Sequence, residues 1–104
     1  FRGELGFSLQ TGAGLAPDIV AEGLQVMFRS GGERVRADGD RHHRTLKYLF
    51  QTHGVVPWMR CHVPLVFAAG KLAAVADLWT ADWAAARPSE SGLGIVWRRH
   101  APIR

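Results

Sequence analysis

The chain has 104 residues, of which 47% are hydrophobic and 21% charged, and its formal net charge is +4. This composition is typical of a globular domain and excludes a disordered tail. No apolar run approaches the roughly 20 residues of a membrane-spanning helix, and the start lacks signal-peptide features. A lone Cys61 leaves no internal disulfide and favours a reducing cytoplasm. We therefore expect one cytoplasmic domain over residues 1–104, cut from a longer protein.

The first third of the chain predicts two strands and a turn. Apolar residues alternate with small or polar ones from Leu5 to Leu9, which is typical of a half-buried strand. A loop containing Gly and Pro is expected over residues 11–17, and a second strand over residues 24–29. Gly31 and Gly32 then end this strand in a turn, because glycine readily adopts positive φ.

The clearest helix is expected over residues 41–53. Asp40 is a suitable N-cap, and Gly54 is suitable for the position just past the end. With about 100° between successive residues, one side of this helix would be apolar and the other basic and polar. The apolar side would carry His42, Leu46, Leu49, Phe50 and His53. The opposite side would carry Arg41, Arg44, Lys47, Tyr48 and Gln51.

The rest of the chain predicts mainly strands. Residues 55–58 indicate a stiff turn with Pro and Trp, and an apolar strand follows over residues 65–69. Gly70 and Lys71 fit a two-residue hairpin loop, with a return strand over residues 72–79. A surface loop over residues 85–92 and a last strand over residues 93–98 complete the chain. The predicted fold is α+β, a mostly antiparallel β-sheet with one main α-helix packed against it.

Positive charge is concentrated in residues 29–60. This segment holds seven bases and three acids, whereas residues 1–28 hold one base and three acids. The seven bases are Arg29, Arg34, Arg36, Arg41, Arg44, Lys47 and Arg60. Six of them are arginine, whose planar guanidinium matches phosphate. The bases are also expected to lack the acidic partners, four residues away, that a salt-bridged helix surface would show. The pattern predicts binding to RNA, although a solvated basic face is the plainer alternative.

The sequence gives little support for catalysis or metal binding. The turn from Ser30 to Glu33 could cradle a pyrophosphate, but Arg34 and Val35 stand where the adenylating signature has Asp and Ser. The five histidines and Cys61 lack paired ligand spacings, so no metal is expected. Cys61 is expected to be a half-buried thiol and not a nucleophile.

Four tryptophans are many for this length, and aromatic side chains can either pack or stack on bases. Trp79 and Trp97 fall in predicted strands and are expected in the core. Trp58 lies in a turn and is the candidate for a surface position, although packing is favoured there too.

One ordered set of residues extends through much of the chain: Phe28-Arg29-Ser30-Gly31-Gly32-Glu33-Arg34, Arg36, Gly39, Leu46-Lys47, Phe50-Gln51, Gly54-Val55, Pro57-Trp58, Arg60, Pro64-Leu65, Ala74-Val75-Ala76 and Leu78-Trp79. Taken together, these residues resemble the C-terminal domain of bacterial tRNA(Ile)-lysidine synthetase over roughly residues 24–83. The chain departs from the family pattern at Ala37, Val56 and Cys61, where turn stiffness and one local ion pair would change.

The resemblance implies a role that composition alone does not. The full enzyme of that family is an ATP-dependent ligase that joins lysine to the wobble cytidine of an isoleucine tRNA, and its adenylating domain is expected to lie outside these 104 residues. The C-terminal domain is implied to be non-catalytic and to hold the tRNA acceptor stem. Its expected partners are this tRNA and the remaining domains of its own enzyme, and ATP would bind only in those domains. Glu33 is expected to orient Arg34 or Arg36.

A second hypothesis is a non-catalytic structural or protein-interaction domain, which would use the basic face and Trp58 to meet other proteins. An independent enzyme is the weakest alternative, because no convergent set of polar groups can be assembled from the sequence.

Overall fold

The structure is a computed structural model that describes residues 3–103. In chain order its elements, with η marking 3-10 helices, are β1 (Glu4–Thr11), α1 (Pro17–Ala21), β2 (Leu24–Met27), β3 (Arg34–Val35), β4 (Arg44–Thr45), α2 (Leu46–Thr52), η1 (Pro57–His62), β5 (Leu65–Ala68), β6 (Lys71–Val75), β7 (Trp79–Thr80), η2 (Asp82–Ala84) and β8 (Ser91–Arg98). Every strand pair is antiparallel. The predicted α+β class is therefore confirmed.

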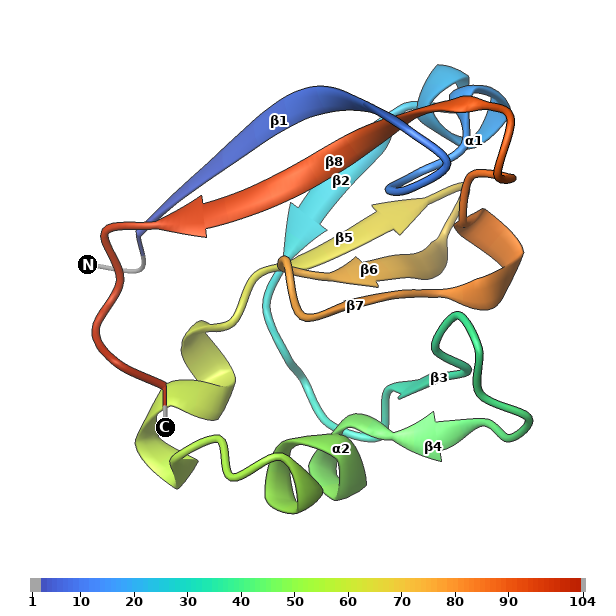
Figure 1. Cartoon of the computed structure of the whole chain (residues 1–104). Coiled ribbons are helices and arrows are strands. Elements are labelled where there is room, and N and C mark those ends of the chain that lie inside the picture. Colours follow the sequence, from blue (N-terminus) through green and yellow to red (C-terminus); the bar gives the residue numbers. More distant parts are fainter. Residues whose placement is uncertain (1–2, 104) are drawn as a thin grey trace.

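Three groups of elements are stacked in Figure 1. The long ribbon of β1 and β8 lies above a four-stranded sheet with the order β2-β5-β6-β7. Below this sheet lie η1, α2 and the short ribbon of β3 and β4. The chain returns to η1 after β8, where the Val56 amide donates to the Ile103 carbonyl at 2.7 Å. This bond ties the last described residues to the helical layer.

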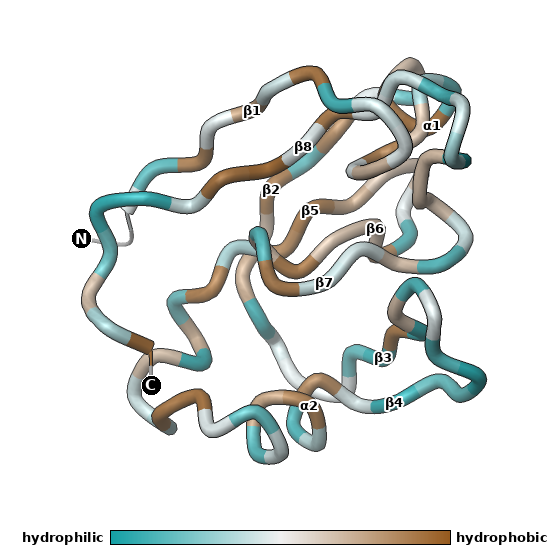
Figure 2. The backbone as a smooth tube through the Cα atoms, viewed as in Figure 1, coloured by the Kyte–Doolittle hydropathy of each residue, from teal (hydrophilic) through white to brown (hydrophobic). Residues whose placement is uncertain are grey.

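The core joins the sheet to α2. Leu65 and Val66 of β5 are buried, as are Leu46 and Phe50 of α2. The Phe50 ring packs against Trp79, with ring centroids 6.0 Å apart. Figure 2 shows hydrophobic colours along β5 and hydrophilic colours around the loop between β3 and β4. Burying each large apolar side chain stabilises the fold by about 1.5–3 kcal/mol. This packing therefore holds α2, and with it the adjoining ribbon of β3 and β4, against the sheet.

The main helix is shorter than the sequence predicted, and its start was predicted wrongly. It begins at Leu46, and the Thr45 hydroxyl caps it by accepting the Tyr48 amide at 3.1 Å. Asp40 therefore does not cap the helix, because residues 41–45 form a bend and then the short strand β4. The Thr45 hydroxyl thus satisfies one free amide in the first turn of the helix, the role expected of Asp40 in a helix that began earlier.

The predicted loop of the hairpin between β5 and β6 was wrong by one residue. Ala69 and Gly70 form the loop, both with positive φ, and Lys71 already pairs with Ala68. Positive φ at both central residues fits a type I′ turn, which matches the twist of the flanking strands. This register places Lys71 at the very start of β6.

The predicted first and last strands are confirmed, and they pair with each other along β1 and β8. The expectation that β1 is half-buried holds only near Leu5, because Phe7 is 46% exposed and Leu9 82% exposed. The loop expected over residues 11–17 is followed by the short helix α1, which the sequence reading missed. Pro17 stands in its first turn, a position that proline favours.

Two of the tryptophan expectations are supported. Trp97 is buried and Trp79 is half-buried against Phe50. Within residues 3–103, no helix is long and apolar enough to cross a membrane.

Candidate nucleic-acid interface

The turn with the paired glycines is filled by a carboxylate from its own chain. Gly31 and Gly32 have positive φ, as predicted. The Ser30 amide and hydroxyl donate to Glu33 Oε2 at 2.8 and 2.9 Å, and the Gly31 amide donates to Oε1 at 3.0 Å. Slight burial raises the pKa of Glu33, but these hydrogen bonds outweigh it and leave the pKa below its usual value. The prediction that Glu33 orients Arg34 or Arg36 is wrong, because its carboxylate closes this turn.

The ribbon of β3 and β4 separates the arginines by face. Arg34 lies opposite Thr45, and Val35 lies opposite Arg44. Since partners across a strand pair point to the same side, Arg44 shares the side of the buried Val35. Arg34 and the next alternate residue, Arg36, take the other side. Extending the register by one residue puts His43 beside Arg36 on that side.

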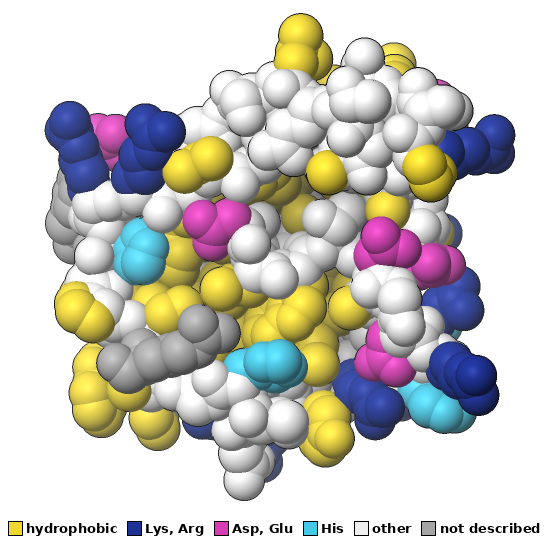
Figure 3. Space-filling model, in the orientation of Figure 1, with side chains coloured by type: hydrophobic (Ala, Val, Ile, Leu, Met, Phe, Trp, Pro, Cys, Tyr) yellow, Lys and Arg dark blue, Asp and Glu magenta, His cyan; other side chains and the backbone are white. Residues whose placement is uncertain are grey.

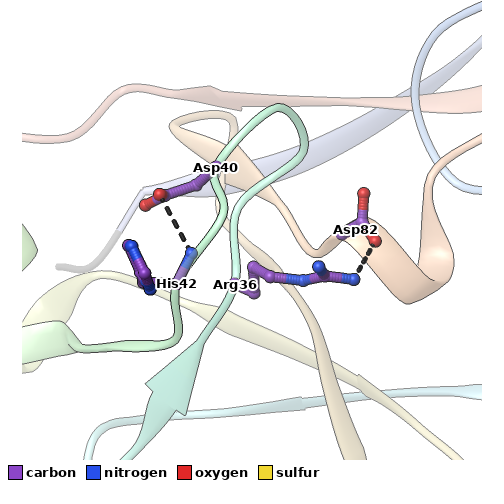
Figure 4. Close-up of polar contacts among 4 residues, drawn as sticks. All are labelled: Arg36, Asp40, His42 and Asp82. Atoms are coloured by element: carbon purple, nitrogen blue, oxygen red, sulfur yellow. Dashed lines mark hydrogen bonds and ion pairs between the residues drawn. The ribbon is translucent and has the colours of Figure 1, made fainter.

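Arg44 is paired on its own side. Its Nε donates to Asp40 Oδ2 at 2.9 Å, and its guanidinium lies 5.1 Å from the centre of the Tyr48 ring. The hydrogen bond from Arg44 is the main cause that lowers the pKa of the Asp40 carboxyl. The same bond raises the pKa of Arg44. Asp40 also accepts the His42 amide at 3.2 Å (Figure 4). The expectation that the bases lack acidic partners four residues away is therefore wrong for Arg44.

The opposite side of the ribbon opens into a hollow of about 440 Å³. Its polar and aromatic lining comes from Arg34, Arg36, His43, Lys71, Asp82 and Trp83. These residues come from two separate segments of the chain, one running from β3 to the start of β4 and the other from the start of β6 to η2. Figure 3 shows basic, acidic and histidine side chains gathered where Figure 1 draws β3 and β4. The hollow is thus a mixed-charge surface with an excess of bases.

Backbone and side-chain contacts fasten the segment after β3 to β7 and η2. Arg36 pairs with the Asp82 carboxylate, as Figure 4 shows. The Asp82 amide donates to the Arg36 carbonyl at 2.8 Å, and the Asp38 amide donates to the Thr80 carbonyl at 2.8 Å. Both side chains of the ion pair stay about 40% exposed, so water still reaches the pair. Salt and competing anions can therefore weaken it.

Lys71 and Trp83 were not among the predicted site residues. The Lys71 ammonium lies 4.5 Å from the centre of the Trp83 ring, a cation–π contact. The Trp83 Nε1–H donates to the Leu72 carbonyl at 2.9 Å, which fixes the ring against the start of β6. The position of Lys71 at this hollow depends on the register of the hairpin between β5 and β6. The sequence predicted that register wrongly by one residue, with Lys71 in the loop.

Two predicted site residues make contacts within the protein. The Arg60 Nε–H donates to the Val55 carbonyl at 2.9 Å and so braces the chain between α2 and η1. The Arg29 guanidinium lies 5.8 Å from the centre of the buried Phe50 ring. Arg41 and Lys47 are exposed, but neither lines the hollow of Arg34 and Arg36. The seven predicted bases therefore do not share one site, and their role in RNA binding stays a prediction.

The outer face of η1 carries a second exposed feature. Trp58 is 70% exposed, so the expectation that it packs is wrong. Cys61 is also exposed and not half-buried. The 3-10 helix turns Met59 inward instead, and Trp58 projects from the adjacent position. Across residues 3–103 there is no group of three or more His, Cys, Asp or Glu placed to hold a metal ion.

Comparison with known proteins identifies the family. The family model described as TilS substrate C-terminal domain matches residues 24–97. The tRNA(Ile)-lysidine synthase of Alkalilimnicola ehrlichii is 39% identical over 90 residues, which cover 86% of this chain and 20% of that protein. That of Methylococcus capsulatus is 35% identical over 98 residues, 92% of this chain and 22% of that protein.

The tRNA(Ile)-lysidine synthase of Escherichia coli O157:H7 is 31% identical over 99 residues, which cover 95% of this chain and 22% of that protein. The chain thus spans about a fifth of the length of these curated relatives. The family model, however, covers well over half of the chain and confirms the resemblance seen in the sequence. The chain belongs to the family of C-terminal substrate domains of tRNA(Ile)-lysidine synthases.

Proposed function

We propose that this chain binds tRNA and holds the acceptor stem of an isoleucine tRNA. The rest of its enzyme would use ATP to join lysine to the wobble cytidine of the anticodon, in the bacterial cytoplasm. The relatives are named for a tRNA product, and they are several times longer than this chain. The chain itself would contribute binding and no catalytic group.

One observation carries this proposal. Arg34, Arg36 and His43, from the segment around β3 and β4, line a single hollow together with Lys71, which comes from the later hairpin at the start of β6. Such clustering favours a polyanion, because each Lys or Arg that neutralises a phosphate releases condensed counterions. An acceptor stem is A-form RNA, whose deep, narrow major groove excludes side chains. Binding would therefore rest on backbone phosphates, 2′-hydroxyls and shape.

The test uses the intact protein that contains this chain and measures tRNA binding at several salt concentrations. We expect the logarithm of the affinity to fall linearly with the logarithm of the salt concentration. An acceptor-stem RNA hairpin should compete with the tRNA. A DNA hairpin of the same sequence should compete less, because it lacks 2′-hydroxyls and the A-form shape. Binding that ignores salt, or equal competition by the DNA hairpin, would contradict the proposal.

Trp58 favours a second candidate function, a surface that packs on other domains of the same enzyme. A tryptophan that is 70% exposed is unusual, and tryptophan is enriched where proteins meet. If this is its role, Trp58→Ala should increase protease cleavage between the domains of the intact protein without lowering the stability of this domain. Unchanged cleavage would argue against an interface at Trp58.

A further inference from the structure

The charges around the hollow of Arg34, Arg36, His43 and Lys71 are unequally neutralised. Arg36 is paired with Asp82. Among the described residues, no carboxylate forms an ion pair with Arg34 or Lys71. Lys71 is held over the Trp83 ring, and the hydrogen bond from Trp83 to the Leu72 carbonyl holds the ring in turn. The Lys71 cation is therefore held at the rim of the hollow, and the Arg34 side chain lines the same hollow.

The size and lining of the hollow fit a piece of nucleic-acid backbone. A volume of about 440 Å³ is larger than one phosphate needs and lies within the roughly 300–1,000 Å³ of ordinary ligand pockets. Trp83 and Leu72 add apolar surface beside the charged groups. A sugar would lie against these apolar atoms while its phosphate met the two cations. Base edges are not needed for such binding, which suits an A-form duplex.

We propose that this hollow binds one sugar–phosphate unit of the RNA backbone, through Arg34 and Lys71, and that Asp82 limits its affinity by holding Arg36. The inference rests on the proposed tRNA binding and assigns part of it to Lys71, which lies outside the basic segment of residues 29–60. Asp82 acts as an internal competitor, because its carboxylate occupies the guanidinium that a phosphate could otherwise bind.

The experiment measures tRNA affinity and its salt dependence in the intact protein, with matched variants. Arg34→Ala and Lys71→Ala should each reduce the salt slope by about one. Arg98→Ala removes the same charge from the exposed end of β8 and is the control. Lys71→Arg should retain most of the affinity, which separates a charge effect from damage to β6.

Asp82→Asn supplies a test in the opposite direction. Freeing Arg36 should raise tRNA affinity by about fivefold, because one more cation then faces the phosphate. Asp18→Asn, on the exposed surface of α1, changes the net charge equally and should raise affinity much less. A gain of affinity is informative, because a variant that merely damaged the fold would lose affinity. If Asp82→Asn fails to fold, the Lys71 variants still decide the question.

The outcomes separate the two proposals. If the wild-type protein binds tRNA with the expected salt dependence, but Lys71→Ala behaves like Arg98→Ala, the hollow is not the backbone site and tRNA binding still stands. If the wild-type protein shows no salt-dependent tRNA binding, the proposed function fails as well. A slope reduced by Lys71→Ala and restored by Lys71→Arg supports the assignment of the hollow.

Discussion

Two regions of the molecule use their bases differently. On the side of β3, β6 and η2, Arg34 and Lys71 line a hollow and have no ion pair with a described residue. On the side of α2 and η1, Arg60 holds the Val55 carbonyl and Arg29 covers the Phe50 ring. The number of bases in a segment therefore overstates the positive charge that a ligand can reach.

The largest effect is expected from a substitution that removes the packing of α2 against the sheet. Phe50→Ala should lower the free energy of unfolding by about 3–5 kcal/mol, because a fully buried ring would leave a cavity beside Trp79. Tyr48→Ala, two residues earlier on the same helix but 48% exposed, is the control. Urea unfolding measures both changes. Equal losses would show that α2 is not anchored through Phe50.

Arg60 tests whether the α2 side uses its bases for structure. Arg60→Ala should lower the free energy of unfolding by about 1–2 kcal/mol, since the Val55 carbonyl loses a charged donor. The salt slope of tRNA binding should stay nearly constant while the protein remains folded. Cys61→Ala, at the exposed neighbouring position, should leave stability unchanged. A normal stability with a reduced slope would instead place Arg60 on the RNA.

Arg44 and Lys47 test the intermediate case. The double variant Arg44→Ala and Lys47→Ala should reduce the salt slope by about one and not two, because Asp40 already neutralises Arg44. The measurement is the same salt titration of tRNA binding. A reduction of two would mean that Arg44 leaves Asp40 when RNA binds.

The smallest effect is a pH dependence at the glycine turn. The folded-state pKa of Glu33 is depressed, so its ionised form adds stability above its ordinary value of 4.5, and this is lost as the pH falls through the lower folded value. Glu33→Gln should remove that part of the acid sensitivity. Thermal unfolding from pH 6 to pH 3 measures it. An unchanged profile would show that the turn does not depend on this carboxylate.

The sequence predicted the elements whose pattern depends on near neighbours. Alternating apolar residues located β1 and β2, and the pair Gly31 and Gly32 located the turn. The apolar spacing of Leu46, Leu49 and Phe50 correctly placed the buried face of α2. These patterns are local, so tertiary contacts changed mainly the ends of the elements.

The candidate site was less predictable because it depends on register and long-range pairing. Asp40 and Thr45 are both acceptable caps, and nothing in the local pattern shows that Asp40 binds Arg44 instead. Asp82 lies 46 residues from Arg36, so their pairing requires the folded sheet. Lys71 reaches the hollow only because the hairpin loop is Ala69 and Gly70.

The most direct test of this account compares two double variants of the intact protein that each remove two positive charges. Arg34→Ala with Lys71→Ala should reduce the salt slope of tRNA binding by about two. Arg29→Ala with Arg60→Ala should leave the slope of the folded protein almost unchanged and lower its stability. Equal slopes in the two variants, or a larger reduction in the second, would contradict the conclusion that Arg34 and Lys71 are more available to RNA than Arg29 and Arg60.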